Sequence, residues 1–73
     1  MKKFLEKAYL KIIYKVPSYS YGEKTASKRK IKEFMFKCGH DEKYIEGISD
    51  DFCQGFGVAK EIILNLIAEE LEK

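Results

Sequence analysis

A thiol and an imidazole lie close together in this sequence, because only Gly39 separates Cys38 from His40. With Cys53 they would supply three zinc ligands, and Asp41 could complete the set. Structural zinc sites, however, use paired C-x2-C or H-x3-H spacings, and neither spacing occurs here. We therefore favour the alternative that both cysteines pack as small apolar residues on helix faces. The sequence predicts no metal and no cofactor.

The catalytic residue types do not form a pattern typical of an enzyme. Cysteine–histidine chemistry requires a third group that orients the imidazole, and His40 is the one histidine in the chain. Asp50 and Asp51 are adjacent, so a helix would point them in different directions. The glutamates near the C-terminus are typical of a solvated helix face. We therefore predict that the protein is not an enzyme.

A glycine-rich segment at residues 54–60, QGFGVAK, is a candidate nucleotide loop. It lacks the third glycine of a dinucleotide fingerprint and does not match the P-loop pattern. The preceding Asp50 and Asp51 would also repel phosphate. The alternative is that Gly55 and Ala59, which lie four residues apart, allow another helix to approach closely. We favour this packing role.

Residues 14–32 combine aromatic rings with positive charge, which is the chemistry that single-stranded nucleic acid or a nucleotide would bind. The candidate contact residues are Tyr14, Tyr19, Tyr21, Lys24, Lys28, Arg29, Lys30 and Lys32. The alternative is a solvated basic helix face, with tyrosines that cover a small core and keep their hydroxyls in water. The single arginine weakens the nucleic-acid hypothesis, because phosphate and base edges favour the guanidinium group.

Apolar periodicity predicts the first two helices. Residues 1–16 form an amphipathic helix that ends before Pro17, and its inward residues are Leu5, Ala8, Tyr9, Ile12, Ile13 and Val16. After the loop at residues 17–23, Thr25 or Ser27 caps a second helix. That helix carries Ile31, Phe34, Met35 and Cys38 inward and ends at Gly39, which suits a left-handed C-terminal position.

A short helix and a long helix follow. Asp41 begins a short helical turn that ends near Gly47, and Ser49 caps the long helix, with Ile48 and Cys53 as a hydrophobic staple. The long helix has an apolar stripe consisting of Phe52, Phe56, Ala59, Ile63, Leu66, Ile67 and Leu71. No strand pattern occurs. The sequence predicts one all-α domain over residues 1–73, a small bundle of three main helices plus one short helix.

The net charge of +2 combines two oppositely charged halves. Residues 1–39 contain eleven basic and three acidic residues, whereas residues 40–73 contain three basic and nine acidic residues. The apolar window at residues 62–68 is too short to cross a membrane. Two cysteines and no apolar signal segment favour a reducing, cytoplasmic location.

Apolar residues extend beyond the predicted stripes, namely Leu10, Tyr14, Phe36, Val58, Ile62 and Leu64. Surplus apolar surface marks protein contacts. The sequence therefore predicts a non-enzymatic interaction protein, homo-oligomeric through its last helix, that binds and blocks or regulates a larger protein. Its size and lysine-rich composition are typical of a phage or mobile-element accessory factor. The predicted interface residues are Phe56, Ala59, Ile62, Ile63, Leu66 and Ile67. Nucleic-acid or nucleotide binding by residues 14–32 is the alternative function.

Overall fold

Residues 2–73, the part of the chain that the computed structural model describes, contain helices and no strands. The three long helices are α1 (Lys2–Lys15), α2 (Lys24–Lys37) and α4 (Asp50–Glu72). The two short elements are the 3-10 turn η1 (Tyr21–Glu23) and α3 (Glu42–Glu46). The predicted all-α class, with three main helices and one short helix, is confirmed. Met1, predicted as the first helical residue, lies outside the described residues.

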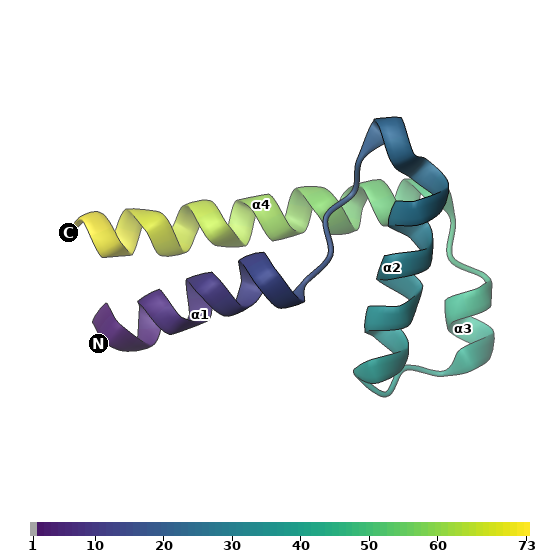
Figure 1. Ribbon diagram of the computed structural model, residues 1–73, viewed down its shortest axis with the longest axis horizontal. Helices are drawn as coiled ribbons and strands as arrows, with labels where there is room; N and C mark the ends of the chain where they lie inside the picture. The colour runs from purple at the N-terminus through teal and green to yellow at the C-terminus, as the bar shows by residue number, and fades with distance from the viewer. Residues whose placement is uncertain (1) are drawn as a thin grey trace.

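The helices form an elongated arm and a smaller head (Figure 1). α1 and α4 lie side by side and run in opposite directions, while α2 and α3 pack near the beginning of α4. We call residues 2–16 with 57–73 the arm, and residues 17–56 the head. The radius of gyration is 13.6 Å, compared with about 11 Å for a compact domain of this length. The molecule is therefore more open than a typical small domain.

Local signals set the ends of α1 and α2 as the sequence predicts. Pro17 follows α1, whose last hydrogen bond runs from the Val16 N–H to the Ile12 carbonyl at 3.1 Å. At the end of α2, Gly39 adopts φ +88°, a conformation that costs glycine little. The His40 and Gly39 N–H groups then donate to the carbonyls of Met35 and Phe36 at 3.2 and 3.0 Å. This pair of bonds is a Schellman motif.

The start of α4 also follows its predicted pattern. The Ser49 hydroxyl accepts a hydrogen bond from the Phe52 N–H at 3.0 Å, which satisfies one of the free donors of the first turn. Ile48 and Cys53, the two members of the predicted staple, are both buried. The staple therefore fixes the direction in which the chain enters α4.

The predicted cap of α2 is wrong. The helix begins at Lys24, directly after η1, and neither Thr25 nor Ser27 stands at its N-cap. Ser27 lies within α2 and is buried, and its hydroxyl accepts a hydrogen bond from the Ser20 N–H at 2.9 Å. Its side chain therefore ties the preceding loop to α2 instead of starting the helix.

The buried core lies in the head. It consists of Ile31, Met35, Ile45, Ile48 and Cys53, with Tyr19 and Phe56 packed against it. In contrast, α1 contains no buried residue, so the arm is a single layer of two helices. Cys53 packs as the predicted small apolar residue, whereas Cys38 is exposed, and the prediction that it faces inward is wrong. Cys38 is exposed because it is the C-cap residue of α2, at the point where the helix leaves the core.

The predicted apolar stripe of α4 is only partly its inward face. Phe56, Ile67 and Leu71 are half-buried, but Ala59, Ile63 and Leu66 are exposed. The inward positions are taken by Cys53, Lys60, Leu64 and Ala68 together with Gly57. The face that packs on α1 and α2 is therefore rotated relative to the prediction.

The close approach in this region occurs at Gly57, and not at Gly55 and Ala59 as predicted. A Cβ atom on Gly57 would lie 2.8 Å from the Cβ of Tyr19 and 3.1 Å from its backbone nitrogen. A Cβ atom on Gly55 would have no neighbour within 4 Å. The loop between α1 and η1 therefore crosses α4 where α4 has no side chain.

The two glycines should respond oppositely to alanine. We expect Gly55→Ala to raise the free energy of unfolding by about 0.5–1 kcal/mol, because alanine favours the helix and meets open space. Gly57→Ala should lower it by about 1–3 kcal/mol, because the new methyl group overlaps Tyr19. Urea denaturation at equal protein concentration measures both, and equal shifts in the same direction would contradict the close contact.

Candidate protein-binding face and basic cleft

A continuous exposed apolar surface lies on α4. Four residues at i, i+3, i+4 and i+7 spacing share one side of the helix, and we call them the outer face of α4: Ala59, Ile62, Ile63 and Leu66. All four are exposed, with Ile62 at 52% and Leu66 at 56%. Val58 extends this face and is also exposed, while Phe56 and Ile67 lie half-buried at its border. The six predicted interface residues thus form one continuous strip.

The outer face points away from the inner contacts of the same helix. Ile62 and Leu64 are two residues apart, which places them about 200° apart around the axis. Leu64 is half-buried on the α1 side, and Ile62 is exposed. α4 is therefore apolar on two opposite sides, of which α1 covers one.

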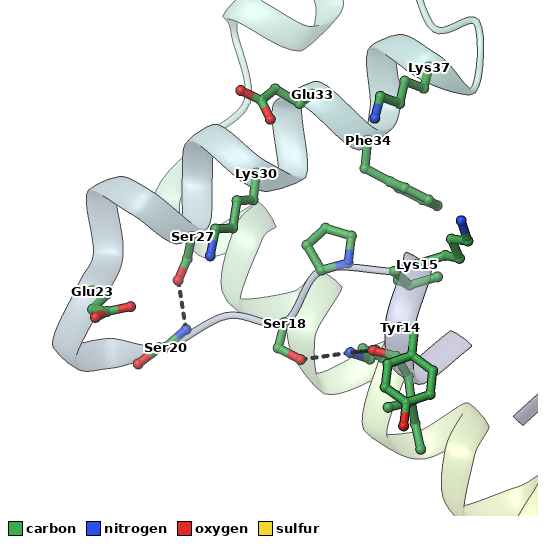
Figure 2. Close-up of a pocket in the computed structure, with 14 residues that line it drawn as sticks. Tyr14, Lys15, Ser18, Ser20, Glu23, Ser27, Lys30, Glu33, Phe34 and Lys37 are labelled. Carbon is green, nitrogen blue, oxygen red and sulfur yellow. Dashed lines mark hydrogen bonds between the residues drawn. The ribbon is translucent and has the colours of Figure 1, made fainter. Parts of the chain in front are cut away.

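A cleft of about 670 Å³ lies between the end of α1, the loop that follows it, and α2 (Figure 2). Its floor includes the apolar residues Val16, Pro17 and Phe34. The basic residues that line it are Lys15, Lys30, Lys37 and Lys60, and the acidic ones are Glu23 and Glu33. Three serines, Ser18, Ser20 and Ser27, also line the cleft.

Three lysines of this cleft, Lys15, Lys37 and Lys60, are absent from the predicted contact set, and Lys60 is the buried one. It is only 9% exposed, and its ammonium group donates to the Ser18 hydroxyl at 2.8 Å and to the Ile13 carbonyl at 3.4 Å. Ile13 lies in the last turn of α1, where free carbonyls carry partial negative charge. A signal was available, because Lys60 stands four residues from both Phe56 and Leu64, and so shares their side of α4.

The structure divides the predicted tyrosine and lysine contacts between two surfaces. Tyr14 and Lys30 line the cleft described above. Lys24, Lys28, Arg29 and Lys32 line a second open hollow, of about 730 Å³, on another side of α2 and next to Asp50. There the Lys28 ammonium pairs with the Asp50 carboxylate at 3.2 Å.

The two remaining tyrosines stack near the loop instead of lining either surface. The Tyr19 and Tyr21 rings pack edge to face with centroids 5.3 Å apart. Tyr19 is half-buried against the core, and its hydroxyl is buried without a hydrogen-bond partner. Tyr21 is exposed. The predicted set of eight residues therefore does not form one continuous platform.

The candidate zinc ligands are arranged as follows. Cys38 and His40 are exposed at the end of α2, and Cys53 is buried in the first turns of α4. Within residues 2–73, no group of three or more histidine, cysteine or acidic side chains gathers as a metal site would require.

Comparison with family models, with curated proteins and with solved structures finds no match for this chain. Over the described part of the chain, no helix combines the length and apolar character that crossing a membrane requires.

The two thiols should differ sharply in reactivity. Burial raises the pKa of Cys53, and Asp50 adds to this effect, although Lys28 and Lys32 oppose it. A raised pKa lowers the thiolate fraction near pH 8, and the thiolate is the reactive form. We expect a colorimetric disulfide reagent to detect one thiol per native chain and two in denaturant. Cys38→Ser should abolish the native reaction, and fast reaction of that variant would contradict the burial of Cys53.

Proposed function

We propose that this chain is a protein-binding module that pairs with a second copy of itself through the outer face of α4 and regulates a larger protein. The observation that carries the proposal is the exposure of Ala59, Ile62, Ile63 and Leu66 on the side of α4 that faces away from α1. Water contact with four aligned apolar residues is unfavourable, and covering them is the driving force for association.

The accessible surface area of the chain supports the proposal that it binds a partner. The accessible surface is 5778 Å², whereas a compact monomer of 8.5 kDa would expose about 4,700 Å². The excess of about 1,100 Å² is similar to the area of about 800 Å² that each protein contributes to a standard interface. The chain therefore exposes an excess area that is similar to one protein's share of a standard interface.

The sequence of α4 favours a second copy as the occupant. In an antiparallel pair centred between residues 62 and 63, Ile62 of one copy lies opposite Ile63 of the other. Ala59 then lies opposite Leu66, so a small residue meets a large one. This isologous arrangement has the two-fold symmetry of most homodimers.

Charge favours the antiparallel direction over the parallel one. A parallel pair would bring together the Glu69 and Glu70 carboxylates of both copies, which repel each other. The antiparallel pair places Glu69 opposite Phe56 and Glu70 opposite Gly55. It also aligns the positive and negative ends of the two α4 dipoles favourably.

The larger target would bind the remaining exposed surface of the arm. On α1, Leu10 and Tyr14 are exposed at 51% and 79%, among Lys3, Lys7 and Lys11. Apolar side chains surrounded by ammonium groups suit a protein with an apolar, acid-rimmed surface. This half of the proposal depends on α1 and is independent of the α4 pair.

A charge in the outer face should separate the two copies. We expect Leu66→Glu to weaken the dimer by about 100-fold or more, because two-fold symmetry places two carboxylates in apolar surroundings. Light scattering over a concentration series measures the mass. Leu10→Glu is the matched control, since it changes an equally exposed leucine on α1, and it should leave the dimer intact. A wild-type chain that stays monomeric at high concentration would end the proposal of self-association.

The direction of the pair can be tested by cross-linking in a Cys38→Ser background. We expect a mixture of Ala59→Cys and Leu66→Cys chains to form mixed disulfide dimers under mild oxidation, because these positions face each other in the antiparallel pair. Electrophoresis without reductant separates the products. If each variant alone forms dimers more readily than the mixture, the pairing is parallel and our arrangement is wrong.

A further inference from the structure

The buried ammonium group of Lys60 has an uncompensated charge. Both of its hydrogen bonds are to neutral acceptors, the Ser18 hydroxyl and the Ile13 carbonyl. No carboxylate in residues 2–73 forms an ion pair with it. A buried charge without an opposite charge costs free energy, and the partial charge at the end of α1 offsets only part of that cost. An ammonium has three donors, so one N–H is left for a ligand.

The cleft that Lys60 lines concentrates further positive charge. Lys15 comes from the last turn of α1, and Lys30 and Lys37 come from α2. In Figure 2, the Lys30 side chain extends from α2 toward the loop that carries Ser18 and Ser20, and the Lys37 side chain lies next to Phe34, whereas the Glu33 carboxylate points away from that loop. Four lysines against two glutamates give the lining an excess of positive charge.

The rest of the lining is amphipathic. The hydroxyl groups of Ser18, Ser20 and Ser27 can each donate a hydrogen bond to a phosphate oxygen. Pro17 and Phe34 provide an apolar wall next to them. The volume of about 670 Å³ is sufficient for a small molecule, since such sites usually span roughly 300–1,000 Å³, but the hollow next to Asp50 is of similar size at about 730 Å³. The buried ammonium of Lys60 and the serine hydroxyls distinguish the cleft from that hollow.

We propose that this cleft binds a small phosphate-bearing ligand of nucleotide size. Its phosphate lies between Lys60 and Lys30, and its flat apolar part lies against Pro17 and Phe34. The site is separate from the outer face of α4, because Lys60 lies on the inner side of that helix. The proposal is therefore independent of self-association.

The other lysines of α2 provide a matched control. Lys24 and Lys32 line the hollow next to Asp50 and do not line the cleft. Lys24→Gln with Lys32→Gln removes the same charge from the same helix as Lys30→Gln with Lys37→Gln. Any difference between the two double variants therefore reports position and not net charge.

Calorimetric titration with AMP, ATP and inorganic pyrophosphate at physiological salt tests the proposal. We expect the wild-type chain to bind, the Lys24/Lys32 variant to bind within about twofold of it, and the Lys30/Lys37 variant to bind at least tenfold more weakly. Leu66→Glu should bind normally, which separates this result from the test of self-association. Equal weakening in both double variants, or no binding by the wild-type chain, would overturn the proposal.

Two further measurements locate the ligand. The backbone amide resonances of Ser18 and Ser20 should shift on addition of AMP, with smaller shifts at Lys24 and Thr25. Lys60→Met keeps an unbranched apolar stem and removes the ammonium group, so it should lose binding while circular dichroism shows an unchanged helix content. If the Lys60→Met variant unfolds, the amide shifts of the wild-type chain show whether the ligand lies in the cleft, and no shift at Ser18 and Ser20 would overturn the proposal. Tighter binding of longer oligonucleotides, with shifts over all of α2, would indicate a polyanion surface and overturn the cleft.

Discussion

The contact of the loop at residues 17–20 with one turn of α4 determines how the arm and the head are joined. At Gly57 the absence of a side chain lets the Tyr19 backbone approach. One turn later, Lys60 holds both the Ser18 hydroxyl and the Ile13 carbonyl. These contacts hold the chain after Pro17 has ended α1, turn it toward α2, and set the distance between α1 and α2. The cleft exists because the loop is held at this position, and α1 covers only one side of α4 for the same reason.

α4 therefore has a different role on each side. Its inner side forms part of the core through Cys53 and part of the arm through Leu64. Its outer face, from Ala59 to Leu66, is covered by nothing in the described chain. A helix that is apolar on two opposite sides is normally buried between two layers. The proposed second copy would supply the second layer. The excess accessible area of the chain is similar to the area that each protein contributes to a standard interface.

Local chemistry explains which features the sequence could predict. Pro17, Gly39 and Ser49 act through their own backbone or side chain within a few residues, so their positions alone predicted the helix ends. The inward side of α4 was predicted incorrectly because apolar residues occur around most of that helix. The side that packs inward is decided by Cys53, Gly57 and Lys60, and a lysine on the inner side contradicts ordinary hydrophobic patterning.

The cleft was out of reach of sequence reasoning for a related reason. Its lysines come from three helices, and only the path of the loop brings Lys15, Lys30 and Lys60 together. The predicted set of residues 14–32 assumed that neighbours in sequence share a surface. In the folded chain, Lys30 and Lys28 lie on different sides of α2, and the Lys28 ammonium forms an ion pair with the Asp50 carboxylate. Proximity along a helix therefore predicted the charge of the region but not its binding surface.

The absence of buried residues in α1 has a consequence for the dynamics of the molecule. Segments with few buried contacts open at low free-energy cost, while a packed core resists opening. The arm can therefore fray and re-form while the head keeps its shape. A partner that binds the arm would restrict this motion, which lowers the affinity that a given contact area provides. The same looseness lets the arm adjust its curvature to the surface that it meets.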